Sequence, residues 1–463
     1  MKVFEKDPKF YRKVFVLGFP IALQTLITVS VGMLDNIMIS GLSQDAFAAT
    51  ALANSYLTVF QIFCMGLGMG ASVLVSRYWG MKITGDPEGK ADVSLKQTVC
   101  LMLRLMLIVA AIFALGALLI PKTIMKSYTD EGTLIELGMI YLKYSVATFF
   151  FMGLSLVITI VLRSVGESRF PLFVSIAALF INLGFNYALI FGRFGLPKMG
   201  IAGAATATLI ARAFEGLSVF LYLILKDKKV GFEIKHLWMR TSTLVGEYMR
   251  VCIPVLISDA IYAVGNNCVT MVIGHLSGDF VAANSITAVT QQLSTVVIQG
   301  VCQSGAIITG QTLGNGEREK AEKQGWLFLG LGLALGALSA LFIFCSKTFI
   351  ISLYGEKTTA EAVSIAYQLL NAISFIIIFQ ATNSIMTKGV LRGGGDTTML
   401  MLADNIFLWV LALPLGILAG FYLKLPAFWI YFFLKFDQIA KTIWCVTRLK
   451  SGKWIKKIST GKN

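Results

Sequence analysis

Long uninterrupted apolar segments are the feature that most limits how this chain can fold. Twelve of them reach about 20 residues or more, and a helix of that length crosses the roughly 30 Å hydrocarbon core of a bilayer. Only 14% of the residues are charged, against about a quarter in an ordinary soluble protein. We therefore predict an all-α polytopic membrane protein with twelve transmembrane helices. The segments lie at about 14–40, 49–76, 97–120, 134–162, 170–192, 201–226, 246–273, 281–310, 325–350, 363–391, 398–422 and 427–449.

The net charge of +15 indicates membrane orientation rather than nucleic-acid binding. If the spans alternate, 29 of the 40 Lys and Arg residues fall on the side of the two termini, eight on the other side and three within spans. Basic residues accumulate on the cytoplasmic side of membrane proteins, where they face anionic lipid. We expect a multi-pass protein of the cytoplasmic membrane, with both termini in the cytoplasm and no nucleic-acid partner. The basic start leads into an ordinary span without a small-residue cleavage site, so we expect no signal peptide.

Cysteine and histidine give no support to metal or thiol chemistry. The seven cysteines are scattered without a CxxC pair, and the two histidines, His236 and His275, lie far apart. Neither an HExxH nor a GxSxG motif occurs, so no catalytic cluster is visible. We expect no cofactor, no metal centre and no enzyme activity.

The sequence is internally duplicated. A shift of 234 places LSQDAFAA (42–49) on LSGDFVAA (276–283), and a shift of 229 places VLRSVGES (161–168) on VLRGGGDT (390–397). Each copy holds six segments, and an even number gives both copies the same orientation. Parallel repeats of this kind occur in secondary transporters. We predict two six-helix lobes joined by a basic cytoplasmic loop: an N-lobe at 1–226, the loop at 227–245 and a C-lobe with a basic tail at 246–463.

The duplication separates acids that the fold needs from acids that it does not. Asp45 and Asp279 occupy the same place in both copies, just before an apolar helix, which favours helix N-caps. Asp35 aligns with Val269, so the fold does not require an acid at its position. Hydropathy alone leaves two interpretations of Asp35, because it lies roughly 31 Å along the first span. It is either a wet interfacial carboxylate or a buried titratable group.

Other ionisable residues within the spans are also candidates, because such groups are costly and tend to mark transport pathways. Asp259 and Asp404 have no partner nearby in sequence, and each is either functional or bonded to a neighbouring helix. Two internal ion pairs are expected from helical spacing: Arg212 with Glu215, and Asp437 with Lys441.

Spans five and six contain a second polar cluster. Asn182 and Asn186 are four residues apart and share a helix face, and Thr208 lies among small residues in the following span. Contact between helices through small and hydroxyl side chains explains the Gly, Ala and Thr pattern. It explains the two amides less well, because each has several hydrogen-bonding positions to satisfy.

These features together resemble the multidrug and toxic compound extrusion (MATE) family of secondary transporters, over essentially the whole chain. The order, spacing and duplication of the motifs make the resemblance specific, and it is strongest to the bacterial branch related to DNA-damage-inducible efflux proteins. The motifs are P-x-x-x-Q (20–24), M-L-D-N-I-M-I-S-G (33–41), L-R-S-x-G-x-S-R-x-P (162–171), N-x-x-x-N-Y-x-L-I-F-G (182–192), G-x-x-G-A-A-x-A-T (200–208) and L-R-G-G-G-D-T (391–397).

The resemblance implies two lobes around a central cavity, and export of cationic or amphiphilic compounds in exchange for H⁺ or Na⁺. It assigns ion coupling to Asp35, helped by Asn182, Asn186 and Thr208. Many members have an acid where this chain has Asn186, so a carboxylate ligand for Na⁺ is missing, and we favour H⁺ while Na⁺ at Asp35 stays open. In this hypothesis a partly dry cavity favours the protonated form of Asp35. Asp35 takes a proton from outside, the drug leaves, and the proton is lost inside.

The resemblance leaves further expectations open. Asp259 and Asp404 would form an ion or substrate site in the C-lobe, as some members have. We expect Gln24 and Asn36 at the substrate cavity, and a monomer in the bilayer. The alternative function is a flippase for lipid-linked precursors or polysaccharides, which shares this architecture and would have a more cationic central cavity.

Overall fold

The structure is a computed structural model that describes residues 7–86, 88–352 and 359–457. These residues are almost entirely helical, and no β-strand occurs among them. Within the described ranges, ten helices are long and apolar enough to cross a membrane. An eleventh span results if α5 (Gly132–Tyr144) and α6 (Thr148–Ser164), which are bent by 61° at their junction, are counted together. The predicted fold class, an all-α polytopic membrane protein, is confirmed.

The last predicted segment, at 427–449, is divided into α15 (Ala427–Leu434) and α16 (Asp437–Lys450). Unlike the other predicted spans, this pair of helices is not long and apolar enough to count as a membrane span. The first half is continuously apolar, whereas the second half includes Asp437 and Lys441, both buried. The last segment is therefore a short apolar helix followed by a helix with a polar, buried face.

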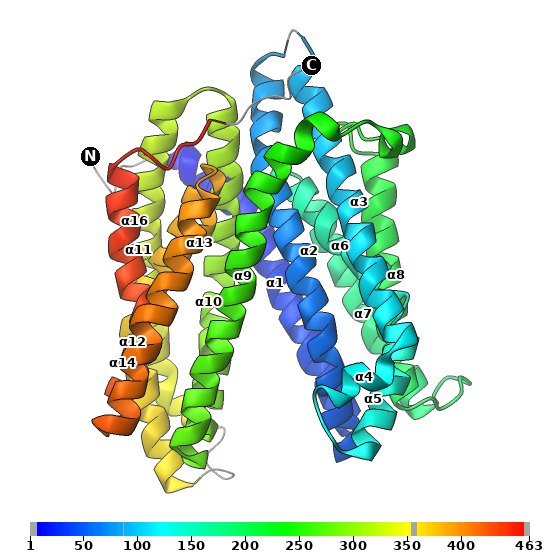
Figure 1. The fold of residues 1–463 in the computed structure, drawn as a ribbon, viewed down its shortest axis with the longest axis vertical. Coiled ribbons are helices and arrows are strands. Elements are labelled where there is room, and N and C mark those ends of the chain that lie inside the picture. The colour runs from blue at the N-terminus through cyan, green and yellow to red at the C-terminus, as the bar shows by residue number, and fades with distance from the viewer. Residues whose placement is uncertain (1–6, 87, 353–358, 458–463) are drawn as a thin grey trace. The chain divides into compact units, whose positions relative to one another are not determined.

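Two compact units divide the chain (Figure 1). The early unit comprises Leu23–Cys252, and within it α7 packs along α8 while α6 packs against both α2 and α8. Besides α5, α6 and parts of α1 and α9, its helices are α2 (Gln44–Thr84), α3 (Lys90–Leu119), α4 (Pro121–Lys126), α7 (Arg169–Phe191), α8 (Ile201–Leu225) and the 3₁₀ helix η1 (Ile234–Trp238).

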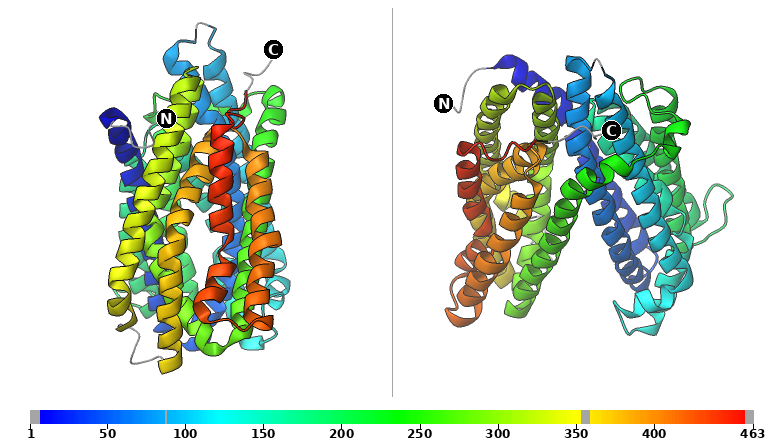
Figure 2. Two further views of the ribbon diagram at one scale, coloured as in Figure 1. Left: turned by 90° about the vertical axis from the view of Figure 1, so that its left-hand side faces the viewer. Right: turned by 45° about the horizontal axis from the view of Figure 1, so that its top comes forward.

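Among the described residues, the late unit comprises 7–22 together with those from Ile253 to Lys457. Helices α11 and α12 lie side by side, and both adjoin α10 (Figure 2). Besides parts of α1 and α9, together with α15 and α16, it contains α10 (Gly278–Gly314), α11 (Arg318–Ser352), α12 (Ala360–Ser384), α13 (Thr397–Ile406), α14 (Leu413–Ile417) and the π-helical turns η3 (Ile385–Leu391), η4 (Phe407–Ala412) and η5 (Leu418–Tyr422).

Helices α1 (Pro8–Ser40) and α9 (Ser242–Leu276) each begin in one unit and continue into the other. In the late unit, α1 crosses α10 so closely that a Cβ on Gly300 would overlap the carbonyl oxygen of Gly18. In the early unit, α9 crosses α2, and a Cβ on Gly70 would lie 2.8 Å from the Cα of Cys252. Gly18 and Cys252 are separated by the 234 positions of the repeat, so the duplication extends to the packing of the helices.

The duplicated LSxD motifs begin α2 and α10, but their aspartates are not the N-caps. Ser43 and Ser277 are the caps, and the Oγ of each accepts a hydrogen bond of 3.0 Å from the backbone N–H three residues later. Asp45 and Asp279 lie within the first turn, where a negative charge interacts favourably with the helix dipole. The N-cap prediction for the aspartates is therefore wrong, because the serine that precedes each helix already satisfies a free N–H group.

The predicted loop at 227–245 is fixed to the early unit. Arg104 of α3 donates hydrogen bonds to the backbone carbonyls of Leu237 and Met239, at 2.6 and 3.0 Å. A guanidinium has five N–H donors and can satisfy several carbonyls that lack an α-helical partner. The connection is thus anchored to α3 at Leu237 and Met239.

Candidate functional site

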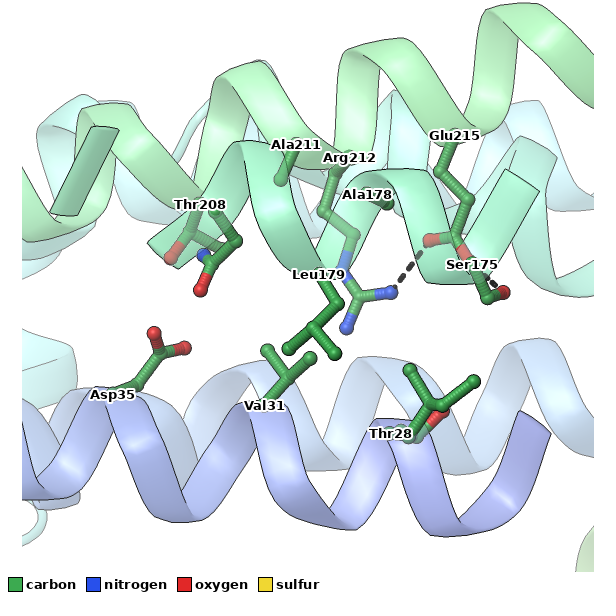
Figure 3. Close-up of a pocket in the computed structure, with 12 residues that line it drawn as sticks. Thr28, Val31, Asp35, Ser175, Ala178, Leu179, Thr208, Ala211, Arg212 and Glu215 are labelled. Atoms are coloured by element: carbon green, nitrogen blue, oxygen red, sulfur yellow. Dashed lines mark hydrogen bonds and ion pairs between the residues drawn. The ribbon is translucent and has the colours of Figure 1, made fainter. Parts of the chain in front are cut away.

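A small polar pocket opens in the early unit between α1, α7 and α8 (Figure 3). Its volume open to a water-sized sphere is about 40 Å³, which is room for a few water molecules or a small ion rather than a drug. The residues that line it are Ile27, Thr28, Val31, Asp35, Ser175, Ala178, Leu179, Asn182, Thr208, Ala211, Arg212 and Glu215.

Asp35 enters this pocket from α1, about one and a half turns before the helix ends. Its carboxylate points toward the helices opposite, where Thr208 lies (Figure 3). The amide Nδ2 of Asn186 donates to Asp35 Oδ1 at 2.5 Å and to Asn182 Oδ1 at 3.1 Å. The structure therefore brings together the four residues that the family resemblance assigned to ion coupling.

The orientation of the Asn186 amide leaves one oxygen unused. Both of its contacts are acceptors, so the NH₂ group must face them and Oδ1 must face away. Asn186 is only 1% exposed, and its Oδ1 has no hydrogen-bond partner among the residues that the structure describes. A buried acceptor without a donor is costly, so this oxygen is suited to a water molecule or a cation.

Asp35 differs from the other span acids in having no fixed cation within 4 Å among the described residues. Glu215 pairs with Arg212 at 2.7 Å, as the helical spacing predicts. Asp259 pairs with Arg392 at 3.4 Å. The remaining two, Asp404 and Asp437, share Lys441 at 3.4 and 3.0 Å, which confirms the predicted Asp437–Lys441 pair. Among these five acids of the described residues, Asp35 is the one without an ion pair, and the cation that lines its pocket, Arg212, is bonded to Glu215.

A chain of polar contacts leads away from the pocket through the early unit. Arg212 bonds to Glu215, whose Oε1 accepts a hydrogen bond of 2.8 Å from Ser175. Gln24 Nε2 donates to Ser175 Oγ at 2.7 Å, and Gln24 Oε1 accepts from Arg163 at 2.5 Å. Gln24 is therefore buried and bonded on both sides of its amide, a setting that sequence reasoning missed.

The repeat shows which parts of this arrangement belong to the fold. A shift of 229 places Ser175 on Asp404, and both bond to a residue of the preceding proline-containing helix, Gln24 and Ser258 respectively. Three of the four coupling candidates have apolar counterparts: Asp35, Asn182 and Asn186 correspond to Val269, Leu411 and Leu415, whereas Thr208 corresponds to Asp437. Asp35 and its two amide neighbours are thus particular to the early unit.

The other predicted site residues have different settings. Asp259 and Asp404 lie in the late unit, each with the cation partner given above, and their role in a C-lobe site stays a prediction. Asn36 follows Asp35 on α1, is exposed, and is not among the residues that line the pocket. The assignment of Gln24 and Asn36 to a substrate cavity likewise stays a prediction. The link from Lys441 to Asp404 joins positions 37 residues apart, which no helical spacing reveals.

Comparison with known proteins gives one family. A family model described as MatE matches residues 20–188 and 254–418, which is most of both copies of the repeat. The chain is 25% identical over 460 residues to the "Probable multidrug resistance protein NorM" of Thermotoga maritima, covering 98% of this chain and 95% of that protein. It is 26% identical over 420 residues to the "Multidrug resistance protein NorM" of Burkholderia vietnamiensis, covering 89% and 87%.

Solved structures agree on the fold. A MATE in complex with MaL6 superposes with a TM-score of 0.84 at 18% identity, covering 97% of this chain and 98% of that one. The same values hold for a transporter of the MOP superfamily from Pyrococcus furiosus, whose description states that the reverse polarity of its binding pocket suggests a different function. At this level of identity the likeness shows the fold alone.

Proposed function

This chain belongs to the MatE family of transporters, and on that premise we propose that it is a secondary active exporter of cationic and amphiphilic drugs. Family membership confirms the resemblance found in the motifs and makes the protein a multi-pass membrane transporter rather than an enzyme. We further propose that it acts as a monomer in the cytoplasmic membrane, with both termini in the cytoplasm.

The names of the relatives support the substrate class. Two proteins that align with nearly the whole chain are named as multidrug resistance proteins. The pocket around Asp35 is too small for such a compound, so the drug would bind elsewhere. Asp35 would then act on the drug through its charge and through the packing of α1.

The observation that carries the proposal is that Asp35 is bonded to an amide and has no ion pair among the described residues, while Glu215, Asp259, Asp404 and Asp437 each have one. A carboxylate in such a place is costly unless its charge is balanced. A mobile cation from solution balances it, and binding or loss of that ion changes the charge that a cationic drug experiences. This is the linkage that an antiporter requires.

We favour H⁺ over Na⁺ as the mobile ion. The pocket offers a single carboxylate, with amide and hydroxyl oxygens from Asn186, Asn182 and Thr208. One proton neutralises Asp35 completely, whereas a sodium ion would rely on mostly neutral ligands. A carboxylate at position 186 would strengthen a sodium site, and this chain has an amide there.

The coupling ion and the substrate class can be tested together in inverted membrane vesicles that contain the full chain. A pH gradient and a Na⁺ gradient are imposed separately, and uptake of a cationic dye is followed. We expect uptake under the pH gradient, acid inside, and none under the Na⁺ gradient alone. Uptake under Na⁺ alone would overturn proton coupling. Absence of dye uptake under either gradient, with movement of a lipid-linked oligosaccharide, would support the flippase alternative.

A further inference from the structure

Lys441 is an ammonium group buried at the centre of an acidic cluster in the late unit. The side chain is 1% exposed, and its Nζ lies 3.0 Å from Asp437 Oδ2 and 3.4 Å from Asp404 Oδ1. The face of the Tyr262 ring lies 4.5 Å from the same nitrogen, measured to the ring centroid. Two carboxylates and an aromatic face are groups that hold a cation.

The acids around Lys441 are themselves held in place. Ser258 donates to Asp404 Oδ2 at 3.1 Å, and Gln438 donates to Asp437 Oδ2 at 2.7 Å. Gln438 is oriented in turn by Asn383, whose Nδ2 donates to its Oε1 at 2.9 Å. Each acid therefore has a second partner, besides Lys441, that holds its carboxylate in place.

Lys441 offsets one of the two negative charges of this cluster, and a second lysine lies near its aromatic side. Asp404 and Asp437 contribute two negative charges, and Lys441 contributes one positive charge. A second cation, Lys388 of η3, lies 5.5 Å from the centroid of the same Tyr262 ring. The neighbouring Asp259 is already paired with Arg392.

We infer that Lys441 is a tethered cation that occupies a monovalent-cation site formed by Asp404, Asp437 and Tyr262. At this cluster Lys441 therefore takes the place of a mobile ion, and the mobile ion of the transport cycle is the one at Asp35. The part of this inference that concerns the transport cycle rests on the proposed function. Its structural content, an occupied cation site, does not depend on that function.

Removal of the tethered ammonium should convert the cluster into a site for a free cation. Both carboxylates would keep their oxygens, including Asp437 Oδ1, which is buried and has no hydrogen-bond partner within the described residues. Lys441→Ala also leaves a space where the side chain was. Sodium ions from solution would then bind between the two carboxylates.

The test is binding of radioactive sodium to the purified full chain, with choline chloride holding the ionic strength constant. All variants carry Asp35→Asn, so that the pocket in the early unit does not contribute. We expect no saturable binding with Lys441 present, about one Na⁺ per chain in Lys441→Ala, and loss of that binding in Lys441→Ala/Asp437→Asn. In the same salts, the melting temperature should rise with Na⁺ concentration only for Lys441→Ala.

Two outcomes would overturn the inference. One is a folded Lys441→Ala variant that binds no sodium. The other is saturable sodium binding with Lys441 intact that Asp404→Asn abolishes, and this second measurement stands even if Lys441→Ala does not fold. Neither outcome involves a measurement of export, so the inference can fail while the proposed function holds. Failure of the proposed function would instead be seen as unaltered dye transport by Asp35→Asn.

Discussion

At the scale of single residues, the acids within the spans differ in their partners. Asp35 has amide partners, and the acids of the late unit have cationic ones. The sequence indicated that Asp35 is unusual, because its counterpart in the repeat is Val269. It did not indicate that Asp404 has a fixed cation, because the partner, Lys441, lies on another helix.

Asn186→Asp tests the reasoning about the coupling ion. A second carboxylate beside Asp35 would add a hard oxygen ligand, and we expect the variant to acquire a sodium site in the early unit. Sodium at ten times its dissociation constant should then stabilise the variant by about 1.4 kcal/mol, measured by thermal melting against choline chloride.

The matched control is Asn36→Asp, which adds the same charge one residue beyond Asp35 and outside the pocket lining. We expect no sodium-dependent stabilisation from it. Equal stabilisation of both variants would show that added negative charge, rather than pocket geometry, attracts the ion. Strong sodium stabilisation of the unaltered protein would contradict the preference for protons.

At the scale of elements, the sequence predicted the long helices well and their breaks poorly. The division between α5 and α6 falls at Ser145–Ala147, where no Gly or Pro marks it and the apolar pattern continues. Ser145 ends α5 by donating its hydroxyl to the Tyr141 carbonyl at 2.8 Å. A serine within an apolar segment is common, so its effect here depends on tertiary packing that hydropathy does not report.

The close helix crossings give a prediction at this scale. Gly300→Ala at the α1–α10 crossing and Gly70→Ala at the α2–α9 crossing each place a methyl group against backbone atoms. We expect each to destabilise the protein by about 1–3 kcal/mol through overpacking, measured by thermal melting in detergent.

Two glycines on α1 and α9, the helices that continue from one unit into the other, serve as controls. Neither has another group within 4 Å of the position that a Cβ would take. Gly32→Ala in α1 and Gly274→Ala in α9 should leave stability unchanged or raise it by about 0.5–1 kcal/mol. Equal destabilisation by all four substitutions would contradict the importance of the crossings.

At the scale of the whole molecule, the two copies of the repeat differ in the partners of their acids. The early unit has Asp35 with an amide partner, and the late unit has Asp404 and Asp437 paired with a lysine. The architecture could be predicted from the apolar segments and the repeat, since both are visible in the sequence. The partners of the acids in each unit could not be predicted, because they depend on which side chains meet in the folded protein. We propose that the early unit holds the mobile ion and the late unit holds a fixed cation, Lys441.

The most direct test of this account is Asp35→Asn in proteoliposomes, with Asp45→Asn as the matched control. Both changes neutralise one acid of the same unit, but Asp45 lies in the first turn of α2, away from the pocket. Uptake of a cationic dye and the accompanying proton flux are recorded under an imposed pH gradient. The account predicts that Asp35→Asn falls to the level of empty vesicles in both signals while Asp45→Asn retains both. Proton-coupled dye transport by Asp35→Asn would contradict it.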